Sequence, residues 1–144
     1  MGRRASREIA MKLLYQLEFQ KDDREEQINY VLDENSLIDK DREYVTDVIE
    51  GVAKNLSYLD KVIEDLSKGW NIGRISKVDL SIMRLSIYEI CFRNDIPYSV
   101  SVNEAVELAK KFSNEDAGSF VNGILSKVSK IMVPPAEEPP AEGG

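Results

Sequence analysis

Hydrophobic residues recur along most of the chain at spacings of three and four, the period of an α-helix that buries one face. The clearest case begins near Asp39, and its apolar positions share a single face: Val45, Val48, Ile49, Val52 and Leu56. The chain has no convincing strand-like alternation and no Asn-Gly hairpin between strand-like runs. The pattern therefore predicts an all-α fold.

Breaks in the periodicity divide the chain into about seven predicted helices. These helices cover about residues 4–20, 24–34, 39–56, 59–66 and 77–93, and two more begin near 101 and 113. Ser101 with Glu104, and Ser113 with Asp116, match the S-x-x-E/D spacing of a capping box at a helix start. The helix over 77–93 is apolar on nearly every side, so we expect it at the centre of a compact bundle.

The prolines mark where this domain ends. Four of the five lie at or after Pro134, in the acidic stretch "VPPAEEPPAEGG". We therefore expect one domain over residues 1–132, followed by a disordered acidic tail over 133–144. Trp70, in the glycine-containing break "SKGWNIG", is interpreted as an anchor between two halves of the bundle.

The composition excludes several kinds of chemistry. The chain has no histidine and only one cysteine, Cys91, which rules out Ser-His and Cys-His nucleophiles and thiolate metal clusters. It has no phosphate-binding P-loop, so we predict neither an enzyme nor a cofactor. Cys91 is typical of a buried thiol in a reducing compartment, and no apolar run is long enough to span a membrane. These features favour a cytoplasmic protein.

The charge distribution suggests one binding surface. The net charge is −7, yet residues 1–12 carry Arg3, Arg4, Arg7 and Lys12 against Glu8 alone. On a helical wheel the three arginines fall within an arc of about 100°, and Tyr15 shares the side of Arg4. Arginines for phosphates beside a ring for stacking are a combination that binds single-stranded RNA. The alternatives are solvated arginines, an Arg4–Glu8 ion pair and packing of Tyr15 against a neighbouring helix.

Three motifs in the second half of the chain resemble the NusB family of bacterial transcription antitermination factors. They are "RISKVDLSIMRLSIYEI", "IPYSVSVNEAVELAKKF" and "FVNGIL", in the order and spacing of that family. The resemblance covers about residues 3–132. It implies two packed helical subdomains that divide near residues 67–75, and a non-catalytic role.

The resemblance also implies partners. Members of this family pair with the small-subunit ribosomal protein that doubles as NusE, and the pair binds the boxA element of nascent RNA. Together they help RNA polymerase read through terminators, chiefly on ribosomal RNA operons. For the free chain, the sequence leaves monomer and homodimer open.

Several positions match residues that the family uses for binding. Arg3, Arg4 and Arg7 match its basic N-terminal motif, and Tyr15 matches a position at the RNA and partner surface. Asp79 matches an acidic position at the NusE contact, whereas Asp116 and Phe120 match positions near RNA. Asp79 and Asp116 equally suit helix capping, and Phe120 suits the core.

Other readings of the whole chain remain. Asn103 and Glu104 are interpreted as structural, with Glu104 in a capping role. A protein-only helical adaptor is one rival function. The accessory helical domain of an RNA methyltransferase is another, although this chain carries no nucleotide-binding loop.

Overall fold

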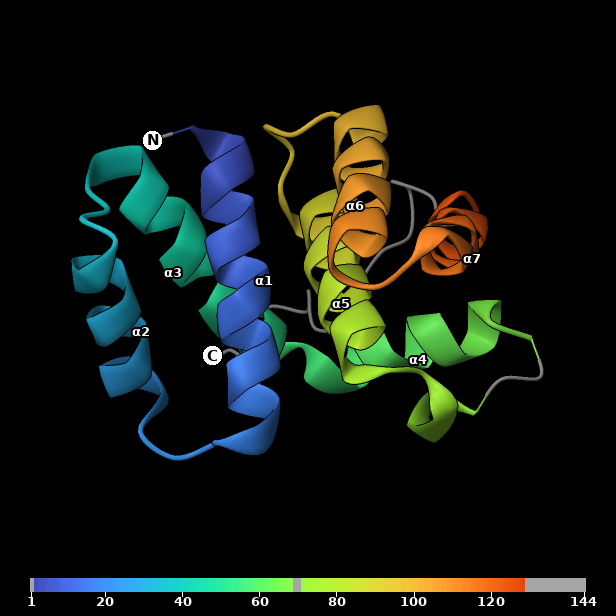
Figure 1. Cartoon of the computed structure of the whole chain (residues 1–144), viewed down its shortest axis with the longest axis horizontal. Helices are drawn as coiled ribbons and strands as arrows, with labels where there is room; N and C mark the ends of the chain where they lie inside the picture. Colours follow the sequence, from blue (N-terminus) through green and yellow to red (C-terminus); the bar gives the residue numbers. More distant parts are fainter. Residues whose placement is uncertain (1, 69–70, 129–144) are drawn as a thin grey trace, which may run out of the picture.

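The computed structural model describes residues 2–68 and 71–128, and these residues form seven α-helices and one short 3₁₀ helix (Figure 1). The helices are α1 (Arg3–Phe19), α2 (Arg24–Glu34), α3 (Asp39–Lys54), α4 (Leu56–Leu66), η1 (Ile72–Arg74), α5 (Lys77–Phe92), α6 (Tyr98–Phe112) and α7 (Glu115–Leu125). The predicted all-α fold is confirmed. The interpretation of Trp70 and the predicted tail over 133–144 lie outside the described residues.

Helix α5 is the centre of the molecule, as its sequence predicts. Every residue from Asp79 to Ile90 is buried, and α5 contacts α1, α3, α4, α6 and α7. Figure 1 shows α1, α2 and α3 on one side of α5, with α6 and α7 on the other. The central helix therefore joins the two sides through one continuous hydrophobic core.

Helix α1 covers this core with the stripe that its period predicts. Ala10, Leu13 and Leu14 are buried, and Ile9 and Leu17 pack half-buried against the core. Because one side of α1 faces α3 and α5, the opposite side faces solvent. That exposed side carries three of the candidate RNA-binding residues, Arg4, Lys12 and Tyr15.

The observed helix starts agree with one of the predicted caps and differ from two. Ser76 caps α5, because its Oγ accepts a hydrogen bond from the Asp79 N–H at 3.1 Å. The predicted start of α6 at Ser101 is wrong: α6 begins at Tyr98, after Pro97, and Ser101 lies inside it. The cap of α7 is Asn114 rather than Ser113, since the Asn114 Oδ1 accepts from the Ala117 N–H at 2.8 Å.

Among the residues that the structure describes, no helix is long and apolar enough to span a membrane. Cys91 is half-buried and packs at the edge of the core, rather than fully inside it.

Candidate nucleic-acid interface

One ridge of α1 carries exposed charged and aromatic side chains. Its members are spaced by three and four residues, which stacks them along one face: Arg4, Glu8, Lys12, Tyr15 and Phe19. A helical wheel also places Met11 and Glu18 on the side of Arg4 and Tyr15. However, Met11 is buried, and Glu18 bonds to Arg84 at 2.8 Å. Tyr15 and Arg4 nevertheless lie on the same side of α1, as predicted.

Arg4 is the most exposed of the three N-terminal arginines, because Arg3 is half-buried and Arg7 is buried. Its side chain is 79% exposed, and its guanidinium forms two hydrogen bonds to Glu104 of α6, at 3.0 and 2.7 Å. These hydrogen bonds raise the pKa of Arg4 above its usual value, so it stays charged. The alternative pairing of Arg4 with Glu8 is not observed, because Glu8 bonds to Lys12 and Lys111 instead.

Helix α6 extends the α1 ridge with a second row of side chains. Lys111 bonds to Glu8 at 3.0 Å, and the ammonium groups of Lys12 and Lys111 lie 5.1 and 5.3 Å from the centre of the Phe112 ring. Lys111 and Phe112 belong to the "AKKF" part of the second motif. Sequence reasoning missed them as site residues, although two lysines beside a ring were a usable signal.

Tyr15 and Phe19 form an exposed aromatic pair further along the same ridge. Their ring centres are 5.1 Å apart in an edge-to-face arrangement. Tyr15 is 39% exposed and Phe19 63% exposed. Large exposed rings are typical of binding surfaces, so Phe19 joins Tyr15 as a candidate contact residue.

The assignment of Arg7 to the RNA surface requires correction, because Arg7 is inside the protein. Only 2% of the residue is exposed, and its Nε bonds to Glu89 of α5 at 2.8 Å. Burial opposes the charge, but the hydrogen bond to Glu89 and the attraction of the nearby acidic groups, Glu104 among them, together outweigh burial and raise the pKa of Arg7. A phosphate could reach this guanidinium only by breaking a buried ion pair, so Arg7 leaves the set of proposed RNA contacts.

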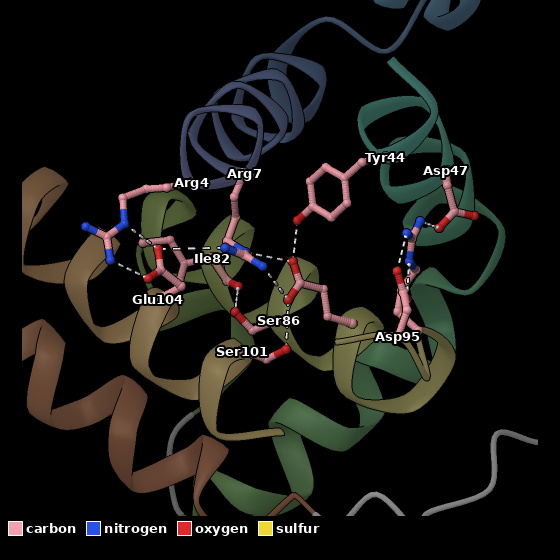
Figure 2. Close-up of polar contacts among 11 residues, drawn as sticks. Arg4, Arg7, Tyr44, Asp47, Ile82, Ser86, Asp95, Ser101 and Glu104 are labelled. Atoms are coloured by element: carbon pink, nitrogen blue, oxygen red, sulfur yellow. Dashed lines mark hydrogen bonds and ion pairs between the residues drawn. The ribbon is translucent and has the colours of Figure 1, made fainter. Parts of the chain in front are cut away.

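Glu89 is the hub of a buried polar cluster that joins four helices (Figure 2). Its carboxylate accepts hydrogen bonds from Arg7 of α1, from the Tyr44 hydroxyl of α3 and from Ser101 of α6, the last at 2.7 Å. Burial raises the pKa of the Tyr44 phenol well above its usual value. Arg3 lies over the Tyr44 ring, 4.4 Å from its centre, which leaves Arg3 half-buried at the edge of the candidate surface.

A surface hollow lies where the starts of α5 and α7 meet, and it brings three candidate residues together. The hollow has a volume of about 370 Å³, and Asp79, Asp116 and Phe120 all line it, as do Arg74 and Ser113. The family resemblance assigned Asp79 to the partner contact and Asp116 and Phe120 to the RNA contact. The structure places them at one location.

Asp79 is the unusual residue of this hollow. It is only 8% exposed, and its Oδ1 is buried with no hydrogen bond from the residues that the structure describes. Burial raises the pKa of this carboxyl, although hydrogen bonds to Ser76 and Ser113 partly oppose the rise. Asp116 is exposed in the first turn of α7, and Phe120 is half-buried against the core. Carboxyl groups whose pKa is raised by burial are common at functional sites.

A family model and curated relatives both identify the NusB family. The model of the NusB family matches residues 4–130. The transcription antitermination protein NusB of Acetivibrio thermocellus is 62% identical, over 95% of this chain and 94% of its own. That of Ruminiclostridium cellulolyticum is 63% identical, over 93% of this chain and 92% of its own.

Solved structures of NusB proteins have the same fold as this chain. The structure of T. maritima NusB superposes with a TM-score of 0.84 at 38% identity, covering 95% of this chain and 96% of that one. A crystal structure of the antitermination factors NusB and NusE in complex with double-stranded RNA superposes with a TM-score of 0.77 at 28% identity. It covers 86% of this chain and 92% of that one.

Proposed function

Because this chain belongs to the NusB family and is thus a transcription antitermination protein, we propose that it binds single-stranded boxA RNA together with ribosomal protein NusE. The bound pair acts within the RNA polymerase elongation complex and promotes transcription of ribosomal RNA operons. The role is non-catalytic and cytoplasmic. A NusB that is 28% identical to this chain has been solved in complex with NusE and double-stranded RNA, which supports RNA and NusE as the two partners.

The observation that carries the RNA proposal is the surface shared by α1 and α6. It combines four cations, Arg3, Arg4, Lys12 and Lys111, with the carboxylates of Glu8 and Glu104. This surface is therefore net positive on a chain of net charge −7. The exposed ring of Tyr15 and the half-buried ring of Phe112 lie beside the cations and offer faces on which unpaired bases can stack.

The RNA path continues from this surface to the hollow. Lys12 contacts Phe112, and Phe112 precedes Ser113, which lines the hollow with Asp116 and Phe120. A short single strand that follows α1 and the end of α6 therefore arrives at the start of α7. Asp116 and Phe120 remain proposed RNA contacts on this basis.

The partner contact is proposed at two places along this path. The exposed pair of Tyr15 and Phe19 offers the aromatic anchors that protein interfaces favour. The acidic hollow at Asp79 suits a basic ribosomal protein. RNA and partner then touch neighbouring parts of one surface, so binding of each should favour binding of the other.

The first test estimates the number of phosphate contacts from the salt dependence of RNA affinity. If Arg3, Arg4 and Lys12 each neutralise one phosphate, a plot of log affinity against log salt for single-stranded boxA RNA should have a slope of about −2, at roughly 0.7 per contact. The double variant Arg4→Gln/Lys12→Gln should reduce the slope to about −0.7. The matched control is Lys61→Gln on α4, an exposed lysine that pairs with Asp65.

Equal slopes in the double variant and in the control would contradict the RNA surface. Capture of NusE with no RNA crosslink to α1 or α7 would favour the protein-only adaptor instead. Circular dichroism checks that the variants keep their helical content.

A further inference from the structure

Glu104 of α6 is shared by two arginines of α1 that lie in different surroundings. Figure 2 shows Arg4 and Arg7 both directed toward its carboxylate. Arg4 holds both carboxylate oxygens, at 3.0 and 2.7 Å, while the Nη1 of Arg7 lies 3.7 Å from Oε1. The first contact is a pair of strong charge-assisted hydrogen bonds, whereas the second is too long for a hydrogen bond.

The short contact restrains Arg4, a proposed phosphate ligand. Two of the five guanidinium N–H groups of Arg4 already bond to a carboxylate, and the pair is electrically neutral. A phosphate that approaches Arg4 therefore meets the negative charge of Glu104 directly behind it. Glu104 is 15% exposed, so water screens its charge less than it screens that of an exposed carboxylate.

Arg7 provides a second partner for the same carboxylate. It uses Nε and Nη2 for Glu89, at 2.8 and 3.3 Å, and this leaves Nη1 directed at Glu104. A shift of less than 1 Å would turn the 3.7 Å contact into a hydrogen bond. Glu104 would then stay paired when Arg4 turns away from it.

We propose that Glu104 regulates RNA affinity by competing with RNA phosphate for Arg4, and that Arg7 receives the Glu104 carboxylate when RNA takes Arg4. This inference rests on the RNA-binding function proposed above. It gives the buried Arg7 a role at the RNA surface without contact to RNA. It also links RNA binding at α1 to the cluster of Glu89, Tyr44 and Ser101 that joins four helices.

The test is a double-mutant cycle on boxA RNA binding by the complex of this chain with NusE. Glu104→Gln removes the competing charge and keeps the shape of the side chain. It should tighten RNA binding about two- to five-fold at low salt, the range that partly exposed ion pairs span. In an Arg4→Gln background the same change should give no gain, because no guanidinium remains to release.

A matched control separates this competition from a general change of charge. Glu107→Gln removes one negative charge one turn further along α6, from an exposed residue that lies 4.0 Å from Lys110. Glu107 attracts Arg4 through its charge alone, whereas Glu104 also accepts two hydrogen bonds from Arg4. It should change RNA affinity less than two-fold, with or without Arg4. Thermal unfolding of every variant checks that differences in affinity do not come from loss of the fold.

The outcomes are distinct. A gain for Glu104→Gln that vanishes without Arg4 supports the competition. An unchanged or weaker affinity, or a gain that persists in Arg4→Gln, overturns it and assigns Glu104 a purely structural role. Failure of the unmodified complex to bind boxA RNA at all would instead overturn the proposed function.

Discussion

Two arginines three residues apart show how far residue-level prediction extends. The sequence assigns Arg4 and Arg7 to one basic cluster, because a helical wheel cannot distinguish a solvent-facing from a core-facing arginine. The partner of Arg7 is Glu89, which lies 82 positions away in the chain and is fully buried. Burial of this pair depends on the packing of α1 against α5, and no local pattern in the sequence encodes it.

Asp79 makes a testable contribution to stability. Burial raises the pKa of its carboxyl in the folded protein, so folding disfavours the ionised form. Its stabilising protonated state is fully present below the unfolded pKa of about 3.9 and is lost as the pH rises through the folded pKa. Asp79→Asn should therefore raise the free energy of unfolding at pH 7.

The comparison needs urea unfolding at several pH values. The advantage of Asp79→Asn over the unmodified chain should shrink as the pH falls through the folded pKa of Asp79. It should be absent below the unfolded pKa of about 3.9, because both side chains are then neutral. The control is Asp116→Asn, an exposed residue of the same hollow, which should show a smaller change at pH 7. A loss of stability at pH 7 for Asp79→Asn would mean that the carboxylate supports the fold.

At the scale of helices, hydrophobic period and capping residues were good guides to where elements lie. The bounds of α2 match the predicted residues 24–34, and α5 begins at the predicted Lys77. The failure at α6 has a physical reason. Ser101 resembles a cap in sequence, but its hydroxyl donates to the buried Glu89, and Glu104 bonds to Arg4. Tertiary contacts use the side chains that a local motif assigned to capping.

Contact between α3 and α5 predicts a strong effect at Gly51. A Cβ added there would lie 2.2 Å from the Tyr88 ring, and Tyr88 is held by a hydrogen bond to Asp47 at 2.9 Å. Gly51→Ala should therefore lower the free energy of unfolding by about 1–3 kcal/mol, despite the better helix propensity of alanine. Urea unfolding measures this loss.

Gly123 of α7 is the matched control, because nothing lies within 4 Å of an added Cβ. Gly123→Ala should be neutral or should stabilise the protein by up to about 1 kcal/mol. Equal effects at the two positions would show that α3 and α5 can separate enough to admit a methyl group.

At the scale of the whole molecule, the fold brings together residues that lie far apart in the sequence. Asp79 lies in the first turn of α5 and Asp116 in the first turn of α7, yet both line one hollow. The family resemblance indicated each residue separately. Their proximity in space depends on how α5, α6 and α7 pack together. Likewise, Lys111 and Phe112 join the α1 surface only because α6 lies beside α1.

The overall charge predicts that RNA binding needs the partner. A net charge of −7 opposes the approach of RNA, and the net positive surface on α1 and α6 offsets this only locally. A basic ribosomal protein docked beside that surface adds cations along the same strand. The pair should therefore bind boxA RNA more tightly than either component, with a salt slope steeper than the −2 expected for this chain alone.

Titrations of boxA RNA against each component and against the pair, over a salt series, measure this effect. In the pair, Arg4→Gln/Lys12→Gln should make the slope shallower by about 1.4, two contacts' worth, because the partner's own contacts are untouched. Linkage adds an independent check, since RNA must strengthen binding of the partner by the same factor by which the partner strengthens binding of RNA. If the pair binds RNA no better than its stronger component, the two ligands do not share a surface on this chain.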